Sequence, residues 1–242
     1  MTRYQMRIAG FAAAYFVVTS LTVGLTRFDG GLALVWFGSA IAALMLISLP
    51  RACWLHGLLA IVAVSSVATA LFGFGPRVAL PMALTNAFEA WLVARMLLAL
   101  RPGRDWLDNV GGLTALVFAG GVVAPAVAAV PGGLVASFAA PGPWYLHASK
   151  WWAAHGLGTV IGFSIAFLAL GVPWTQVAAR WTRRLGFELA GFLCLIGSTA
   201  YAAMSQALLP LLFLPIVPLL LASYRCGREG AAFGMLVIAV IA

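Results

Sequence analysis

Residues 84–95, LTNAFEAWLVAR, place an amide, Asn86, and an acid, Glu89, three positions apart inside an apolar segment that runs from Val78 to Leu100. A helix needs about 20 apolar residues to cross the roughly 30 Å hydrocarbon core of a bilayer, and this segment is long enough. It lacks the alternation of polar and apolar residues that marks the strands of a membrane barrel. The stretch therefore predicts a membrane-spanning helix that carries an acid.

Similar segments recur along the chain. Of its 242 residues, 64% are hydrophobic and only 8% are charged, and the mean hydropathy is +1.05. These values lie far outside the range of soluble domains. We expect one integral membrane domain over residues 1–242, an all-α bundle of about eight spans. The first seven are predicted at Ile8–Thr26, Gly31–Leu49, Cys53–Phe72, Val78–Leu100, Val110–Val130, Trp151–Gly171 and Leu185–Gln206.

The last part of the chain is irregular. An eighth span, about Leu208–Tyr224, contains Pro210, Pro215 and Pro218, and prolines break a regular helix. A further segment begins near Gly230 and has too few apolar residues to cross a bilayer. It is either truncated or re-entrant, and we favour a chain that is a fragment of a longer protein.

Basic residues predict the orientation. With the N-terminus in the cytoplasm, ten arginines fall on the inner side, against three basic residues outside. That bias follows the positive-inside rule and predicts a multi-pass membrane protein with its N-terminus in the cytoplasm. The ten are Arg3, Arg7, Arg51, Arg101, Arg104, Arg180, Arg183, Arg184, Arg225 and Arg228, and the three are Arg27, Arg77 and Lys150. The net charge of +8 follows from topology and lipid contact, so we expect no nucleic-acid partner.

Catalytic and metal-binding motifs are missing from the sequence. It has no P-loop, GxSxG, HExxH, kinase or cyclase signature. Its three cysteines form no CxxC pair, and a closed metal site needs four ligands. We expect no enzyme activity, no cofactor and no metal in this chain.

The polar residues inside the spans point to a pocket. At 1.5 Å per residue, Asn86 lies about 12 Å and Glu89 about 16 Å below the outer surface. An acid near the midplane is a functional candidate by default. Trp36, Trp152 and His155 also lie between the outer surface and the midplane, and we predict that they join Asn86 and Glu89 around a pocket open to the outside. The prolines of the eighth span would add freed carbonyls.

One stripe of the sixth span predicts a helix contact. In WWAAHGLGTVIG, residues 151–162, Trp151, His155, Gly158 and Gly162 fall along one face. Gly158 and Gly162 form a small-xxx-small pair, which predicts close packing against another helix.

The order of these motifs resembles a known family. WFGSAIAA at 36–43, NAFEA at 86–90, WWAAHGLG at 151–158 and LPLLFLPIVPLLLASYRCGREGAA at 209–232 are similar to the membrane-associated sensor domain, first type. This bacterial module precedes histidine kinases and diguanylate cyclases. The sequence departs from the family at Ala154 and His155, where a glycine and an aspartate are usual.

The resemblance implies a sensory input domain. A ligand or protein partner reached from the outer side would bias a fused cytoplasmic kinase or cyclase, which we expect to form a homodimer through that output domain. The alternative is a transporter or channel, because carriers also place acids and interrupted helices at the midplane. We find no repeated motif between the two halves of the chain that would support a carrier.

Overall fold

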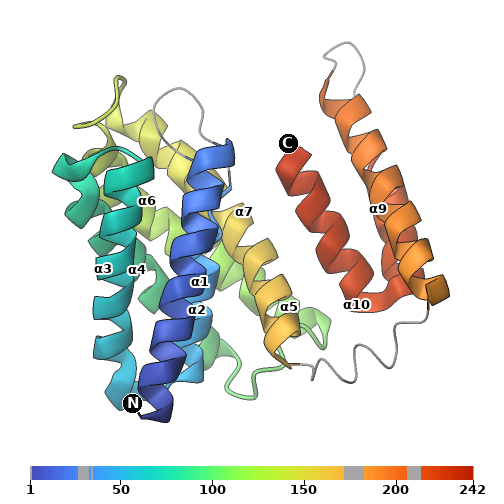
Figure 1. Cartoon of the computed structure of the whole chain (residues 1–242), viewed down its shortest axis with the longest axis horizontal. Helices are drawn as coiled ribbons and strands as arrows, with labels where there is room; N and C mark the ends of the chain where they lie inside the picture. Colours follow the sequence, from blue (N-terminus) through green and yellow to red (C-terminus); the bar gives the residue numbers. More distant parts are fainter. Residues whose placement is uncertain (1, 27–32, 34, 172–182, 206–213, 242) are drawn as a thin grey trace. The chain divides into compact units, whose positions relative to one another are not determined.

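The computed structural model describes residues 2–26, 33, 35–171, 183–205 and 214–241. Among them it contains helices and no strand ladder, so the all-α prediction is confirmed (Figure 1). The helices belong to two compact units, residues 1–163 and 164–242, divided within α7. The elements are α1 (Arg3–Thr26), α2 (Gly38–Ser48), η1 (Arg51–Cys53), α3 (Trp54–Phe72), α4 (Pro76–Leu100), α5 (Val110–Leu116), η2 (Val117–Val123), α6 (Ala124–Ala136), α7 (Trp144–Gly171), α9 (Arg183–Met204) and α10 (Ile216–Ile241).

Six helices in the described residues are long and apolar enough to cross a membrane, so a count of eight spans is not confirmed. They are Arg3–Gly24, Arg51–Phe72, Pro76–Leu100, Val110–Ala136, Trp144–Leu170 and Leu185–Met204. The first unit carries many exposed large apolar side chains, including Leu55, Leu59 and Phe118, as expected for helices that face lipid.

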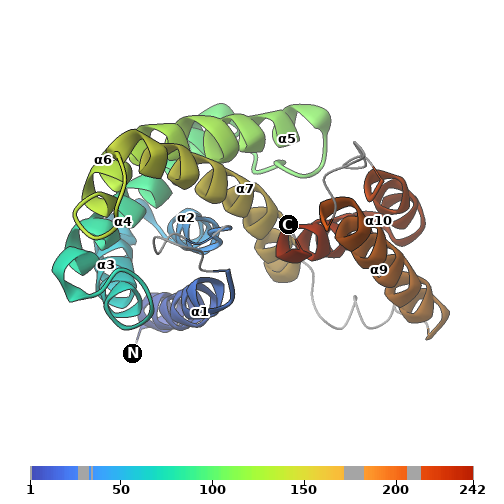
Figure 2. The ribbon, with the colours of Figure 1, turned by 90° about the horizontal axis from the view of Figure 1, so that it is seen from above.

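The second predicted span is shorter than the sequence indicated. Only Gly38–Ser48 is helical, because Val35, Trp36 and Phe37 run in non-helical backbone. Figure 2 shows α2 surrounded by α1, α4 and α7, and nearly all of its side chains are buried. Because it is fully enclosed, α2 is hydrophobic on every side and its ends cannot be read from periodicity.

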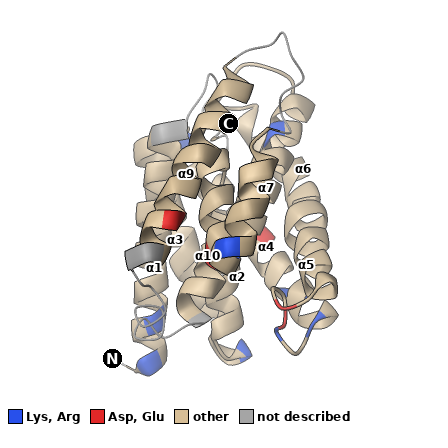
Figure 3. Ribbon diagram, turned by 90° about the vertical axis from the view of Figure 1, so that its right-hand side faces the viewer, with Lys and Arg blue, Asp and Glu red and all other residues tan. Residues whose placement is uncertain are grey.

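Two arginines cap the last carbonyls of α2. Arg7 donates to the Ser48 carbonyl at 3.3 Å, and Arg104 donates to the Ile47 carbonyl at 3.0 Å. These contacts satisfy acceptors that no longer have a helical partner. Figure 3 shows basic residues near the start of α1 and in the loop between α4 and α5.

A glycine and a proline mark the start of α4. Gly75 adopts φ +89 and Pro76 begins α4, a combination suited to a helix start.

Within the helix made of α5, η2 and α6, Pro125 lacks the N–H that would bond to the Gly121 carbonyl, and the preceding turns are π-helical. Gly156 of α7 makes room for that carbonyl, since an added Cβ would lie 2.3 Å from it.

The connection between the predicted spans Val110–Val130 and Trp151–Gly171 is mostly helical. Pro131 lies inside α6, which continues to Ala136, and α7 begins at Trp144. A proline within a span can be tolerated because neighbouring helices satisfy the freed backbone groups. His155 is consequently eleven residues from the start of α7, deeper than a span beginning at Trp151 implied.

The second unit contains α9 and α10, and α10 folds back on itself. Gly227 has φ 68 and ψ −148 in its middle. An added Cβ on Gly234 would touch Leu219, and one on Gly230 would touch the Ala222 carbonyl, so the two arms of α10 are antiparallel. Of the three prolines predicted to interrupt this region, Pro215 precedes α10, Pro218 lies in its first turn, and Pro210 is outside the described residues.

Candidate functional site

Glu89 is the buried centre of a polar cluster in the first unit. Its side chain on α4 is fully enclosed. Its Oε2 accepts a hydrogen bond from Nε1 of Trp151 at 2.9 Å and lies 2.8 Å from Nδ1 of His155. Trp151 and His155 are one helical turn apart on α7. An acid near the middle of one helix is therefore held by two side chains of another.

The donor and acceptor roles in the contact between His155 and Glu89 depend on the tautomer of the imidazole. An indole N–H can only donate, so Oε2 acts as an acceptor toward Trp151, and the matching arrangement has Nδ1–H of His155 donating to the same oxygen. Ser39 of α2 lies 3.5 Å from Nδ1. In the neutral ring Nε2 then carries the lone pair, and no described residue makes a hydrogen bond to Nε2.

The imidazole of His155 also stacks on two indoles. Its ring centroid lies 4.0 Å from that of Trp151 and 5.3 Å from that of Trp36, with interplanar angles of 23° and 13°. These contacts and the hydrogen bond to Glu89 fix the orientation of the ring.

Asn86 extends the cluster to two more helices. Its Nδ2 donates to Oγ of Ser65 on α3 at 3.0 Å, and the hydroxyl of Tyr15 on α1 donates to the same oxygen at 3.2 Å. All three side chains are buried. Asn86 and Glu89, on adjacent turns of α4, therefore connect α4 to α1, α3 and α7 by polar contacts.

A small cavity lies beside this cluster, under the turn between α3 and α4. It offers about 40 Å³ to the centres of water-sized molecules. Its polar wall contains Trp36, Asn86, Trp151, His155 and Thr69, and its other lining residues are Val23, Ala33, Ala68, Gly73, Phe74 and Met82. Glu89 is not itself part of the lining. It lies behind Trp151 and His155, which are.

Several buried polar atoms of the cluster have no partner among the described residues. They are Oε1 of Glu89, Oδ1 of Asn86, Nε1 of Trp36 and Oγ1 of Thr159. Leaving a buried donor or acceptor unpaired costs about 1–3 kcal/mol per group. Such atoms require an explanation, and a site for an exchangeable ligand or water is one.

The comparison with known families assigns the chain to a membrane family. The MASE1 family model matches residues 5–242 of the chain. The chain belongs to the MASE1 family. MASE1 is a multi-span membrane sensor domain of histidine kinases and diguanylate cyclases, and it is not catalytic. No curated protein and no solved structure matches the chain.

The family match confirms the resemblance derived from the sequence. A multi-pass membrane protein with a sensory role follows from it. Among the described residues of this MASE1 chain, no group of three or more His, Cys, Asp or Glu side chains could hold a metal ion.

Of the five predicted pocket residues, four lie together in the MASE1 chain. Trp36, Asn86 and His155 line the cavity, and Glu89 bonds to His155. Trp152 does not lie with them. Its side chain is 45% exposed, and its Nε1 donates to the Val122 carbonyl at 3.1 Å, on a different side of α7.

Gly158 and Gly162 lie against the start of α2. A Cβ on Gly158 would be 2.2 Å from the Trp36 carbonyl oxygen, and one on Gly162 would be 2.9 Å from the Phe37 ring. The Trp36 backbone N–H donates to the Ala154 carbonyl at 3.0 Å. The glycine stripe thus allows the non-helical backbone before α2 to rest directly on α7 and places Trp36 over His155.

Sequence reasoning missed Trp151, Ser65 and Tyr15 as members of the cluster. For Trp151 a signal was present, because it precedes His155 by four residues and so shares its helix face. Ser65 and Tyr15 carried no such signal. Each is one polar residue in a long apolar helix, and only the tertiary packing brings it to Asn86.

Proposed function

We propose that this chain is the sensory input domain of a bacterial signalling protein in the cytoplasmic membrane, with its N-terminus in the cytoplasm. It detects a small molecule or a protein partner from the outer side. It then regulates a histidine kinase or diguanylate cyclase domain fused to it, which forms the homodimer contacts. The family assignment supports the sensory role, and the positive-inside bias supports the orientation.

One observation supports Glu89 as the sensing centre. A fully buried acid is bound through one oxygen to Trp151 and His155, while its other oxygen has no described partner beside a small cavity. An acid that only joined helices would stabilise the fold most if both of its oxygens accepted hydrogen bonds. The free oxygen and the cavity together favour a site that exchanges partners.

The mechanism requires two helix arrangements that differ in their contacts at this site. A ligand that reaches the cavity changes the hydrogen bonds of Asn86 and His155. Because Asn86 contacts α3 and His155 contacts α4 and α2, the change alters how α4 packs against α7. A shift between these helices is passed to the cytoplasmic side, where the output domain reads it.

The test uses the domain fused to a diguanylate cyclase. Glu89→Gln keeps the size and polarity of the side chain and removes its charge. We expect it to reach the membrane at normal abundance and to change cyclic diguanylate output at least several-fold. His56→Gln is the control, since His56 is exposed on α3. If Glu89→Gln gives normal output that still responds to growth conditions as the parent does, Glu89 has no sensory role.

The carrier alternative retains one supporting feature, the half-length helix α2 whose N-terminus lies beside His155. Carriers build substrate sites from such half helices. A carrier would move a solute across vesicles that contain the purified chain alone, with no output domain attached. The input-domain proposal predicts no transport in that assay.

A further inference from the structure

Building on the proposed function, we propose that the cavity binds a small organic cation with a primary ammonium group. Nε2 of His155 and Oδ1 of Asn86 supply hydrogen-bond acceptors, and Glu89 supplies the counter charge. This class of ligand follows from the polarity, charge and size of the cavity.

Acceptors outnumber donors around the cavity. Among the lining residues, Oδ1 of Asn86 and, in the neutral ring, Nε2 of His155 have no described donor. Oε1 of Glu89, which lies behind the lining, has none either. The corresponding unpaired donor is Nε1 of Trp36. A ligand that satisfies this set must be rich in hydrogen-bond donors, and a primary ammonium carries three.

The charge of the cluster favours a cation. Glu89 is fully buried, and no lysine or arginine is among the buried side chains of the described residues. The titratable groups that face Glu89 are His155 from α7 and Tyr15 from α1, while α2 contributes Ser39 and α3 contributes Ser65. A buried carboxylate is costly without a counter charge. A bound cation beside the cluster can provide that charge.

The size of the cavity limits the ligand. The volume open to the centres of water-sized molecules is about 40 Å³. One water needs roughly 10–15 Å³ of this kind of volume, so the cavity accommodates about three or four non-hydrogen atoms. Val23, Ala68, Phe74 and Met82 line the apolar part, where a short alkyl chain would pack. Methylammonium and ethylammonium fit this description, whereas polyamines and aromatic amines are too large.

The test uses the intact chain in detergent with ¹⁵N-labelled histidine. The sequence has three histidines, and comparison with His155→Gln assigns the signals of His155. Titration with ethylammonium chloride should shift the Nε2 resonance saturably and more strongly than the Nδ1 resonance. Sodium chloride at equal ionic strength, and ethanol as a neutral molecule of the same size, should not.

A second arm tests the counter charge. In Glu89→Gln the affinity for ethylammonium should fall at least tenfold, with thermal unfolding used to show that the variant is folded. Equal binding of ethanol, unchanged affinity in Glu89→Gln, or no saturable shift would each overturn the ammonium proposal.

The two proposals fail separately. If Glu89→Gln alters the output of the cyclase fusion but ethylammonium does not bind, the sensory role of Glu89 stands and the ligand class is wrong. If ethylammonium binds at His155 and the fusion ignores both ligand and substitution, the site is real and the sensory role is wrong.

Discussion

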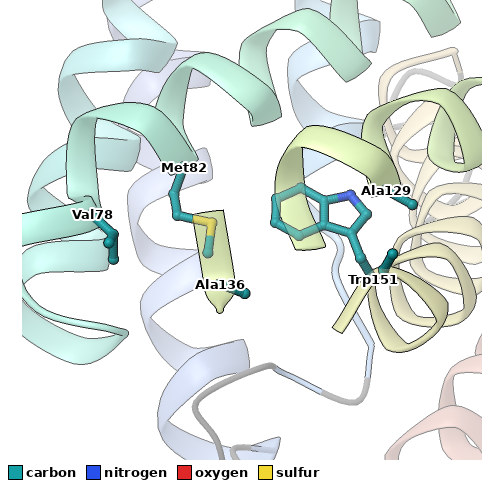
Figure 4. Packing of buried hydrophobic residues seen from close by; sticks show 6 residues of the cluster. Val78, Met82, Ala129, Ala136 and Trp151 are labelled. Carbon is teal, nitrogen blue, oxygen red and sulfur yellow. The ribbon is translucent and has the colours of Figure 1, made fainter. Parts of the chain in front are cut away.

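Trp151 and Trp152 are adjacent in the chain but occupy different environments. Trp151 is 2% exposed and bonds to Glu89, and it packs with Val78 and Met82 of α4 and with Ala129 and Ala136 of α6 (Figure 4). Trp152 is largely exposed and bonds to a backbone carbonyl. The difference between the two indoles gives a matched experiment.

Trp151→Phe should destabilise the chain more than Trp152→Phe. Both changes remove an indole N–H, but only the first removes a donor from a buried acid, at a cost of about 1–3 kcal/mol. We expect a clear drop in the thermal unfolding midpoint in detergent for Trp151→Phe. For Trp152→Phe we expect the free energy of unfolding to change by no more than roughly 0.5 kcal/mol. Equal shifts would mean that the Glu89 contact contributes little.

Gly158 is a position where any side chain meets backbone. Gly158→Ala would put a Cβ against the carbonyl group and nitrogen of Trp36, which cannot move aside as a side-chain end can. Overpacking of this kind costs about 1–3 kcal/mol. Gly10→Ala is the control, because nothing lies within 4 Å of a Cβ there and alanine improves helix propensity by up to about 1 kcal/mol.

The measurement is the folded yield and unfolding midpoint of the two variants. Gly158→Ala should lower both, and Gly10→Ala should leave them unchanged or raise them. A Gly158→Ala chain as stable as the parent would show that the segment before α2 does not rest on α7.

At this scale the sequence predicted much of the site. Depth and polarity pointed to Trp36, Asn86, Glu89 and His155, because polar groups in an apolar span are rare enough to stand out. The choice of Trp152 in place of Trp151 shows the limit. Two tryptophans in succession look alike in composition, and only their angular position on α7, measured against α4, separates them.

Among the elements, α10 shows why a helix can turn back. Gly227 has a backbone conformation, φ 68 and ψ −148, that residues with a side chain rarely adopt. The arms on either side are joined by contacts between Leu219 and Gly234. Arg225 also bonds to Glu188 of α9, with its Nη2 at 3.1 and 3.2 Å from the two carboxylate oxygens.

Spin labels at Ile216 and Val240 should report this hairpin. Both positions are exposed, and in one continuous helix they would be about 36 Å apart at 1.5 Å per residue. In the hairpin we expect less than about 20 Å, since a neighbouring helix axis lies only 8–10 Å away. Gly227→Ala should cost roughly 1–3 kcal/mol. A label distance near the full helical value in the parent chain would contradict the hairpin.

The elements were predicted with uneven success. Long apolar helices such as α3 and α4 were predicted almost to their ends, because Pro, Gly and Arg mark the boundaries. The length of α2 was not, since the residues before it are as apolar as those within it. A proline does not end every helix of this chain: Pro81, Pro131 and Pro218 all lie within helices.

For the whole molecule, the orientation in the membrane is the most direct prediction to check. In a chain whose natural cysteines have been replaced, Phe138→Cys lies in the α6 to α7 connection and Gly103→Cys in the α4 to α5 connection. An impermeant thiol reagent should label Phe138→Cys in intact cells and Gly103→Cys only after permeabilisation. The reverse pattern would place the cavity on the cytoplasmic side and remove the outer route for a ligand.

The short helix α2 has a consequence for how the chain is made. Its eleven residues extend about 16 Å at 1.5 Å per residue, about half of the hydrocarbon core. The backbone N–H of Trp36, just before α2, bonds to Ala154, a residue synthesised more than one hundred positions later. The seating of α2 is therefore completed only after α7 has been synthesised, through the same contact that positions Trp36 over His155.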